Sequence, residues 1–253
     1  MVMAGHSKWA SIKHKKAATD AKRGKLFTKL ARAITVAARE GGGDPAGNHT
    51  LAAAVEKAKG YSMPKDNIQR AIDKGTGEGE AGTIERVLYE GYGPAGTALL
   101  VEALTDNRNR TGSEVRNAFD RHGGNLGEPG SVAWQFEKKG VVLLDGTRYS
   151  DDDVIGAIDA GAEDVVAEDD TLKITCEPQS LTAVREALTD SGVEIESAEL
   201  AMEPQNVVEV TDAAEARRLI RLIDMLDDHD DVDEVHSNFD ISAELLEAAE
   251  AAA

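Results

Sequence analysis

The chain has 253 residues, of which 41% are hydrophobic, and it carries 28 Lys and Arg against 47 Asp and Glu. A chain of this length and apolar content buries a real core in one to three domains, which excludes a protein that is disordered throughout. The single cysteine excludes an intrachain disulfide, and no apolar run approaches the roughly 18 residues of a membrane helix. Because the basic N-terminus also lacks the apolar segment of a signal peptide, we expect a cytoplasmic protein with no membrane partner.

The charge is distributed unevenly along the chain. Residues 1–75 hold 15 Lys and Arg against 6 Asp and Glu, whereas the remaining residues hold 13 against 41. This asymmetry indicates a basic end that seeks an anion and acidic domains that stay solvated and repel one. The acidic overall composition therefore does not exclude a nucleic-acid partner.

Changes in composition and periodicity divide the chain into six segments. In order they are a basic arm at 1–24, a helical bundle at 25–75, a Gly- and Glu-rich linker at 76–83, an α+β domain built from 84–139 and 205–240, an inserted ferredoxin-like domain at 140–204, and a tail at 241–253. The linker contains little that can pack, so we expect it to be flexible.

The bundle is predicted from helical periodicity. From Leu26 to Ala38 apolar residues recur about every four positions, and a run of three glycines from Gly41 stops the pattern. A second helix is expected over residues 48–60 and a third over residues 64–75, where a proline occupies the first position. Together they make a three-helix bundle.

The two α+β domains follow from the order of strands and helices. Residues 140–204 show the order strand, helix, strand, strand, helix, strand, which is the βαββαβ arrangement of a ferredoxin-like fold. Residues 84–139 and 205–240 supply the other strands and helices, so we expect the ferredoxin-like domain to be inserted in this second α+β domain. The predicted fold class is α+β, with an N-terminal three-helix bundle followed by two α+β domains.

Two local expectations accompany this assignment. Residues 131–136 alternate so that Val132, Trp134 and Phe136 share one face, which predicts a strand whose apolar face lies in the core. The tail after Ser242 contains helix-forming residues but little to bury, so we expect it to fray.

The segment from Gly5 to Lys25 carries the chemistry of a phosphate-binding arm. It holds seven Lys and Arg, two His and one Trp, with Asp20 as its single acidic residue. Closely spaced cations release counterions from a polyanion, and Trp9 is suited to stack on an unpaired base. A solvated tail with Trp9 docked on the bundle is the alternative. The candidate contacts in the arm and along the helix that follows are Lys8, Trp9, Lys13, His14, Lys15, Lys16, Lys22, Arg23, Lys25, Lys29 and Arg32.

A second group of cations follows an expected strand that ends at Thr105. The Asn and Asp residues there are good helix-start residues, but Arg108 and Arg110 are not needed for capping. Arg116 lies on the expected helix that follows. We therefore predict a second, weaker anion contact at Arg108, Arg110 and Arg116.

No local motif assembles a catalytic or metal-binding site. Residues 91–96 match a dinucleotide-binding glycine pattern in form only, because a strand rather than a helix follows, and we expect a turn there. The acidic run from Asp227 to Glu234 lacks the central glycine and final glutamate of a calcium loop, so we expect a solvated turn. Cys176 is expected to be a small buried hydrophobe. We expect no metal and no cofactor.

Nine blocks between residues 5 and 140 form a distinctive set. They are GHSKW at 5–9, IKHKK at 12–16, KRGKLFTKL at 22–30, ITVAAREGGGDP at 34–45, MPKDNIQRAI at 63–72, YEGYGPAG at 89–96, EALTDNRNRT at 102–111, HGGNLG at 122–127 and GSVAWQFEKKG at 130–140. In these blocks the chain resembles the YebC/PmpR family of probable transcriptional regulators, which includes a mitochondrial translational activator of cytochrome oxidase.

The resemblance implies a three-domain, non-enzymatic regulator of gene expression. Family members are described either as DNA-binding transcriptional regulators or as ribosome-associated factors that ease translation of proline-rich stretches. By position, the basic arm matches the family's N-terminal motif, and Lys65, Arg108 and Arg110 are weaker matches. The expected partner is nucleic acid, either duplex DNA bound by a transcriptional regulator or ribosomal RNA bound by a translation factor on the ribosome.

Two other classes of function stay open at the level of sequence. An enzyme would need a site assembled at a domain cleft from His122, Arg108, Asp106 and Cys176. A protein-interaction adaptor would act through the acidic face and would tolerate replacement of the basic arm by alanine. The sequence does not predict an oligomeric state.

Overall fold

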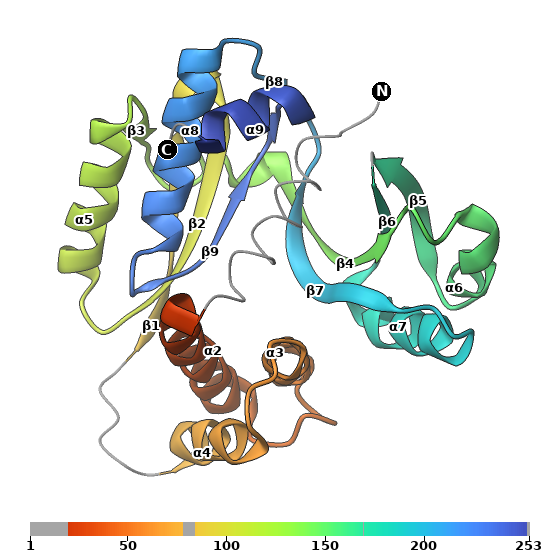
Figure 1. The fold of residues 1–253 in the computed structure, drawn as a ribbon. Coiled ribbons are helices and arrows are strands. Elements are labelled where there is room, and N and C mark those ends of the chain that lie inside the picture. The colour runs from red at the N-terminus through yellow and green to blue at the C-terminus, as the bar shows by residue number, and fades with distance from the viewer. Residues whose placement is uncertain (1–19, 78–83, 169, 252–253) are drawn as a thin grey trace.

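The computed structural model describes residues 20–77, 84–168 and 170–251. Figure 1 shows a helical bundle lying beneath two α+β units, each of which contains a four-stranded sheet. The fold class is the one that the sequence predicts: an N-terminal helical bundle followed by two α+β units, one of them inserted in the other. No described helix has the length and hydropathy needed to span a bilayer.

The bundle consists of α2 (Asp20–Gly41), α3 (His49–Gly60) and α4 (Lys65–Thr76). Their apolar faces meet in one buried cluster that includes Leu30, Ile34, Leu51 and Ile68. α2 and α4 approach so closely that a Cβ atom on Gly75 would lie 2.4 Å from the carbonyl oxygen of Thr35. The first helix begins at Asp20 rather than Lys25, because apolar periodicity marks only the packed turns, and good helix formers suffice in the turns before them.

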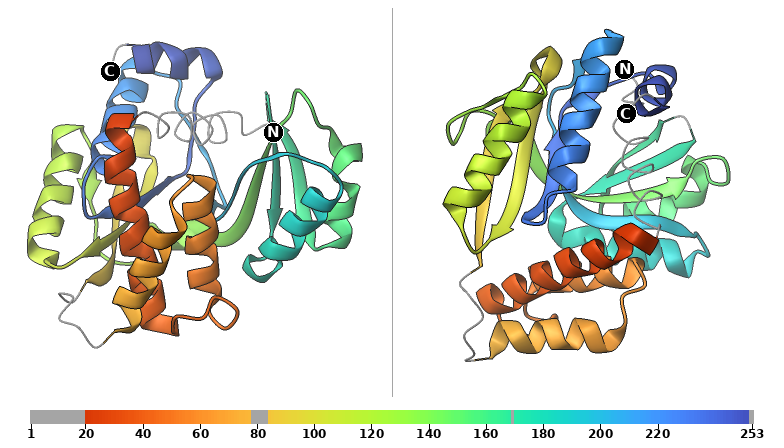
Figure 2. Two further views of the ribbon diagram at one scale, coloured as in Figure 1. Left: turned by 60° about the horizontal axis from the view of Figure 1, so that its bottom comes forward. Right: turned by 60° about the vertical axis from the view of Figure 1, so that its left-hand side comes forward.

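The first α+β unit contains an antiparallel sheet in the order β3-β1-β2-β9. Its strands are β1 (Glu85–Tyr92), β2 (Ala98–Thr105), β3 (Asn125–Leu126) and β9 (Val232–Ser237). A 3-10 turn at Pro94–Gly96 joins β1 to β2, so the glycine-rich residues 91–96 form a turn between strands, as predicted. Helices α5 (Arg108–Arg121) and α8 (Ala213–Asp227) cover one face of the sheet and enclose a buried cluster with it (Figure 2).

The C-terminal segment adds a parallel pair of short strands, β8 (Val208–Glu209) with β10 (Phe239–Asp240), and a helix, α9 (Ala243–Ala251). Leu246 and Ala249 of α9 are buried in the same cluster as Phe119, so the expectation that the tail frays is wrong. At the start of α9 the carbonyl oxygen of Ser242 accepts a hydrogen bond from the amide of Leu246 at 2.9 Å.

The inserted unit has the strand order β5-β6-β4-β7, with every neighbouring pair antiparallel. Its strands are β4 (Phe136–Asp145), β5 (Ala162–Glu168), β6 (Thr171–Cys176) and β7 (Ile195–Pro204), and its helices are α6 (Ile155–Asp159) and α7 (Leu181–Asp190). The 3-10 turns Asp151–Val154 and Pro178–Ser180 precede the two helices. This is the ferredoxin-like arrangement. The chain enters and leaves the unit side by side, because Phe136 pairs with Pro204.

Residues 131–136 do not form the strand that their alternation predicts. Ala133–Gln135 is a 3-10 turn, and Trp134 is 65% exposed. Val132 and Phe136 are buried, as expected. The prediction that all three apolar side chains lie in the core is therefore confirmed for Val132 and Phe136 and wrong for Trp134.

The buried carboxylate of Glu90 explains this departure. It accepts hydrogen bonds from the backbone amides of Gly130, Val132 and Ala133 at 2.7–2.8 Å. These amides are thereby taken out of any strand ladder, and the chain turns instead of extending. Burial by itself would raise the pKa of Glu90, but the three amide donors outweigh it and lower the pKa.

Candidate nucleic-acid interface

The predicted contact residues divide into those that the structure describes and those that it does not. Lys8, Trp9, Lys13, His14, Lys15 and Lys16 lie outside the described residues. Lys22 and Arg23 lie in the first turns of α2, where only the backbone is described. The described candidate side chains are Lys25, Lys29, Arg32, Lys65, Arg108, Arg110 and Arg116.

Lys25, Lys29 and Arg32 share one face of α2, because they are four and three residues apart on a helix. This face meets the C-terminal end of α8. Lys29 Nζ donates to the carbonyl oxygen of Asp227, and Lys25 Nζ donates to that of Asp228 at 3.3 Å. Carbonyl oxygens at the end of a helix carry the negative end of its dipole, so both lysines already have a favourable electrostatic partner within the protein.

The carboxylate of Asp231 is the centre of a buried ion network. Its Oδ1 accepts a hydrogen bond from Arg32 at 2.9 Å, and its Oδ2 accepts one from Arg110 at 2.6 Å. The hydroxyls of Thr111 and Thr105 donate to the same Oδ2 at 2.7 and 3.2 Å. Burial alone would raise the pKa of Asp231, but the bonds from Arg110, Thr111 and Arg32 outweigh it and lower the pKa to about 2.

This network joins the bundle to the first α+β unit. Arg32 comes from α2, Arg110 from α5, and Thr105 from the end of β2. Arg32 also donates to the carbonyl oxygen of Leu104 at 2.9 Å. The expectation of a solvated acidic turn is therefore wrong for Asp231, whose side chain is only 6% exposed. Nothing in the local sequence distinguishes Asp231 from its acidic neighbours, so its role becomes visible only in the fold.

Ion pairs of α3 hold the bundle to both α+β units. Nζ of Lys57 lies 2.9 Å from a carboxylate oxygen of Glu199 in β7 and also pairs with Glu234 in β9. Burial would lower the pKa of Lys57, but the neighbouring carboxylates, Glu199 foremost, raise it above its usual value. Glu56, one residue earlier, pairs with Arg185 of α7. The bundle is therefore tied to the rest of the protein by charged contacts.

The weaker candidates occupy two separate places. Lys65 is exposed in the first turn of α4, and Arg108 and Arg116 are exposed on α5. Arg110 is bound to Asp231 and also to Asp106 at 3.0 Å. Among these four described side chains, only Arg110 meets a residue of the α2 face, Arg32, and the two share the single negative charge of Asp231.

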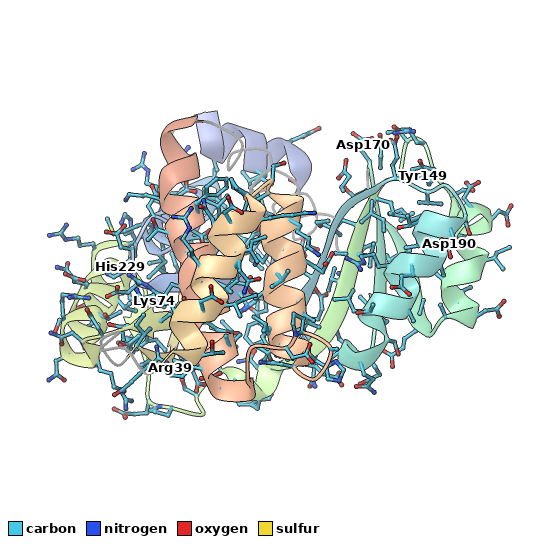
Figure 3. All side chains as sticks on the ribbon, turned by 90° about the horizontal axis from the view of Figure 1, so that it is seen from below. Arg39, Lys74, Tyr149, Asp170, Asp190 and His229 are labelled. Carbon is cyan, nitrogen blue, oxygen red and sulfur yellow. The ribbon has the colours of Figure 1, made fainter. Side chains whose placement is uncertain are left out.

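The charge polarity of the sequence is also a polarity in space. In Figure 3 the bundle, which carries Arg39 and Lys74, faces the viewer, and the inserted unit, which carries Asp170 and Asp190, lies to one side. Residues 140–204 contain 3 basic against 17 acidic residues. This flank therefore repels a polyanion that approaches the bundle.

The four residues of the enzymatic alternative do not meet. Asp106 and Arg108 lie at the start of α5 and His122 at its end, about 20 Å apart along a helix of 14 residues. Cys176 lies in β6 of the inserted sheet, where burial and neighbouring carboxylates raise the pKa of its thiol to about 11. A nucleophilic thiol needs the opposite shift. Nor does the described part of the chain contain a group of three or more His, Cys, Asp or Glu side chains that could hold a metal ion.

The fold and the charge pattern define a class of protein, in which a basic helical bundle is tied by ion pairs to two acidic α+β units. Two family models match the chain: "TACO1/YebC protein N-terminal domain" over residues 7–78 and "TACO1/YebC second and third domain" over residues 84–239. The chain belongs to the TACO1/YebC family, which confirms the resemblance seen in the sequence blocks.

Individual relatives agree with this membership over nearly the whole chain. A "Probable transcriptional regulatory protein" of Rubrobacter xylanophilus is 57% identical over 246 residues, which cover 96% of this chain and 98% of the relative. A relative of the same description from Desulfotalea psychrophila is 53% identical, and the match covers 97% of this chain and 98% of the relative. The crystal structure of a conserved hypothetical protein from Aquifex aeolicus is 46% identical, with a TM-score of 0.80 over 90% of this chain and 94% of that one.

Proposed function

We propose that this protein regulates gene expression by binding nucleic acid, and that its basic arm makes the phosphate contacts. Membership of a family whose relatives are named probable transcriptional regulatory proteins supports the regulatory role. The observation that carries nucleic-acid binding is the charge polarity, since residues 1–75 are basic in a chain of net charge −19. Acidic units that repel a polyanion leave the basic end as the surface for it.

The ion pairs of α2 narrow the contact surface within this basic end. Lys25, Lys29 and Arg32 already bind oxygen atoms of the protein, so a phosphate group would compete with those partners for the same cations. We therefore assign the leading contacts to the residues before them, Lys8, Trp9, Lys13, His14, Lys15, Lys16, Lys22 and Arg23. Lys65, Arg108 and Arg116 remain weaker candidates.

Crosslinking in growing cells, followed by sequencing of both the DNA and the RNA attached to the purified protein, tests this function. Enrichment of a few promoter segments would support transcriptional regulation on duplex DNA. Enrichment of ribosomal RNA would support the alternative, a translation factor that acts on the ribosome. If neither nucleic acid is enriched over an uncrosslinked control, the proposal is wrong and an adaptor role gains support.

A pair of matched variants tests the assignment to the arm. Replacing Lys13, Lys15 and Lys16 by Gln removes three charges from the arm, and the same replacement at Lys59, Lys74 and Lys138 removes three charges from exposed lysines elsewhere. For the arm variant we expect weaker binding and a shallower dependence of log K on log salt, by about 0.9 per lost contact on duplex DNA or about 0.7 on a single strand. An equal effect of both variants would show that only net charge matters, which contradicts the assignment.

A further inference from the structure

The acidic turn at the end of α8, residues 227–231, lies against the cationic face of α2. Four of its five residues are aspartates. Each of the three cations of the face, Lys25, Lys29 and Arg32, donates a hydrogen bond to an oxygen atom of this turn. The turn therefore supplies to these cations the oxygen atoms that the phosphate groups of a nucleic acid would supply.

This contact has a buried part and an exposed part. In the buried part Arg32 lies 2.9 Å from Oδ1 of Asp231, whose side chain is only 6% exposed. In the exposed part Nζ of Lys25 lies 3.4 Å from Oδ1 of Asp230, and the two side chains are 59% and 75% exposed. An ion pair with this exposure adds little to stability. The exposed part is therefore open to competition by an anion in solution, whereas the buried part holds the bundle in place.

The exposed part lies beside the leading contacts of the arm. Lys22 precedes Lys25 by three residues on the same helix, which is about 4.5 Å along the helix axis. A phosphate group that reaches this end of α2 comes within about a Debye length, roughly 8 Å at physiological ionic strength, of Asp228 and Asp230. At that range the carboxylates are only partly screened, and they repel the phosphate group.

The other charges at this junction do not reverse the balance. Arg110 adds a cation at Asp231, but it also pairs with Asp106 at 3.0 Å. His229, the one residue of the turn that is not acidic, lies 2.8 Å from a carboxylate oxygen of Glu114. Among the described side chains of the junction, carboxylates therefore outnumber the lysines and arginines, and the cationic face of α2 is neutralised.

We propose that the acidic turn competes with nucleic acid for the cationic face of α2, and that Asp228 and Asp230 thereby determine specificity. This inference rests on the proposed function. A nucleic acid bound at the arm gains Lys25 and Lys29 only when it places phosphate groups where the oxygen atoms of the turn now lie. A nucleic acid of another shape meets the carboxylates and binds weakly, because an unfavourable contact discriminates as effectively as a favourable one.

The experiment measures binding of a labelled single-stranded RNA and a labelled duplex DNA, both of mixed sequence, by fluorescence anisotropy over a range of salt concentrations. Asp228→Asn with Asp230→Asn removes two exposed carboxylates beside Lys25, so the variant should stay folded. We expect binding about threefold tighter per carboxylate at low salt, the effect of a unit charge about 6 Å away in water. The matched control, Asp151→Asn with Asp152→Asn, removes the same charge from exposed side chains of the inserted unit and should gain much less.

Replacing the lysines completes the test. Lys25→Gln with Lys29→Gln should cancel the gain of the Asp228→Asn, Asp230→Asn variant, and should cost less in the unmodified protein, where the turn already occupies both lysines. Equal gains of the turn variant and the matched control would overturn the inference, and so would an equal cost of the lysine replacement in both backgrounds. In either case binding itself persists, so the proposed function stands. If no protein of the set binds either probe, the proposed function fails and the inference fails with it.

Discussion

Replacing Asp231 by Asn is expected to destabilise the protein by about 2.5 kcal/mol at pH 7. Folding lowers the pKa of this carboxyl group from its ordinary value of 3.8 to about 2, and one unit corresponds to about 1.4 kcal/mol. The side chain is only 6% exposed, so solvent screening reduces this value little. Asn keeps the shape of the side chain but removes the charge that both Arg32 and Arg110 share.

The neighbouring substitution Asp230→Asn is the matched control. It removes the same charge one residue away, but the Asp230 carboxylate is 75% exposed and lies 3.4 Å from Nζ of Lys25. An exposed ion pair of this kind contributes about 0.5 kcal/mol or less. Urea unfolding of both variants and of the unmodified protein, followed by circular dichroism, measures the difference. If the two variants are equally stable at pH 7, the reasoning about the Asp231 network is wrong.

The pH dependence gives a second check on the same network. Because folding lowers the pKa of Asp231, its contribution is fully present above the pKa of the unfolded chain and is lost as the pH falls through the folded pKa. The stability difference between the unmodified protein and Asp231→Asn should therefore be constant from pH 8 to about pH 5 and should fall to about half by pH 3. A difference that is undiminished at pH 3 would refute the assignment to this carboxylate.

Two further substitutions test the packing of the bundle and the support of the turn at Trp134. Gly75→Ala should destabilise the bundle by about 1–3 kcal/mol, because its Cβ would lie 2.4 Å from the carbonyl oxygen of Thr35. The control Gly60→Ala, whose Cβ meets nothing within 4 Å, should be neutral or slightly stabilising. Similar melting temperatures for the two variants would contradict the close approach of α2 and α4. Glu90→Gln should cost about 1.5–3 kcal/mol and speed hydrogen exchange at the amides of Val132 and Ala133, because a charged acceptor for three N–H groups is lost. The exposed Glu128→Gln is its control, and unchanged exchange in Glu90→Gln would contradict the role of this carboxylate.

The elements that could be predicted are those whose evidence is local. The three bundle helices and the βαββαβ order follow from apolar residues that repeat with the period of a helix or a strand, because each element buries one face. The sequence blocks pointed to the family, and the uneven charge to an anionic partner. The predicted helices and strands are present in the fold because the faces that pack together are the apolar faces that the periodicity marks.

Apart from the earlier start of α2, the departures involve partners that are distant in the chain. The amide of Val132 is bound by Glu90, 42 residues away, which turns a predicted strand into a 3-10 turn. The tail forms α9 because Leu246 meets a cluster built by α5 and α8.

By itself the sequence determined the order of elements, the α+β class and the basic character of the N-terminal end, since each depends on residues that are neighbours along the chain. Only the tertiary structure decided which of the basic residues are already neutralised. Arg32 and Asp231 are 199 residues apart in sequence and 2.9 Å apart in space. No periodicity or composition reports such a pair, because burial of the Asp231 carboxylate is unfavourable by itself and is offset only by hydrogen bonds from residues that the fold brings to it.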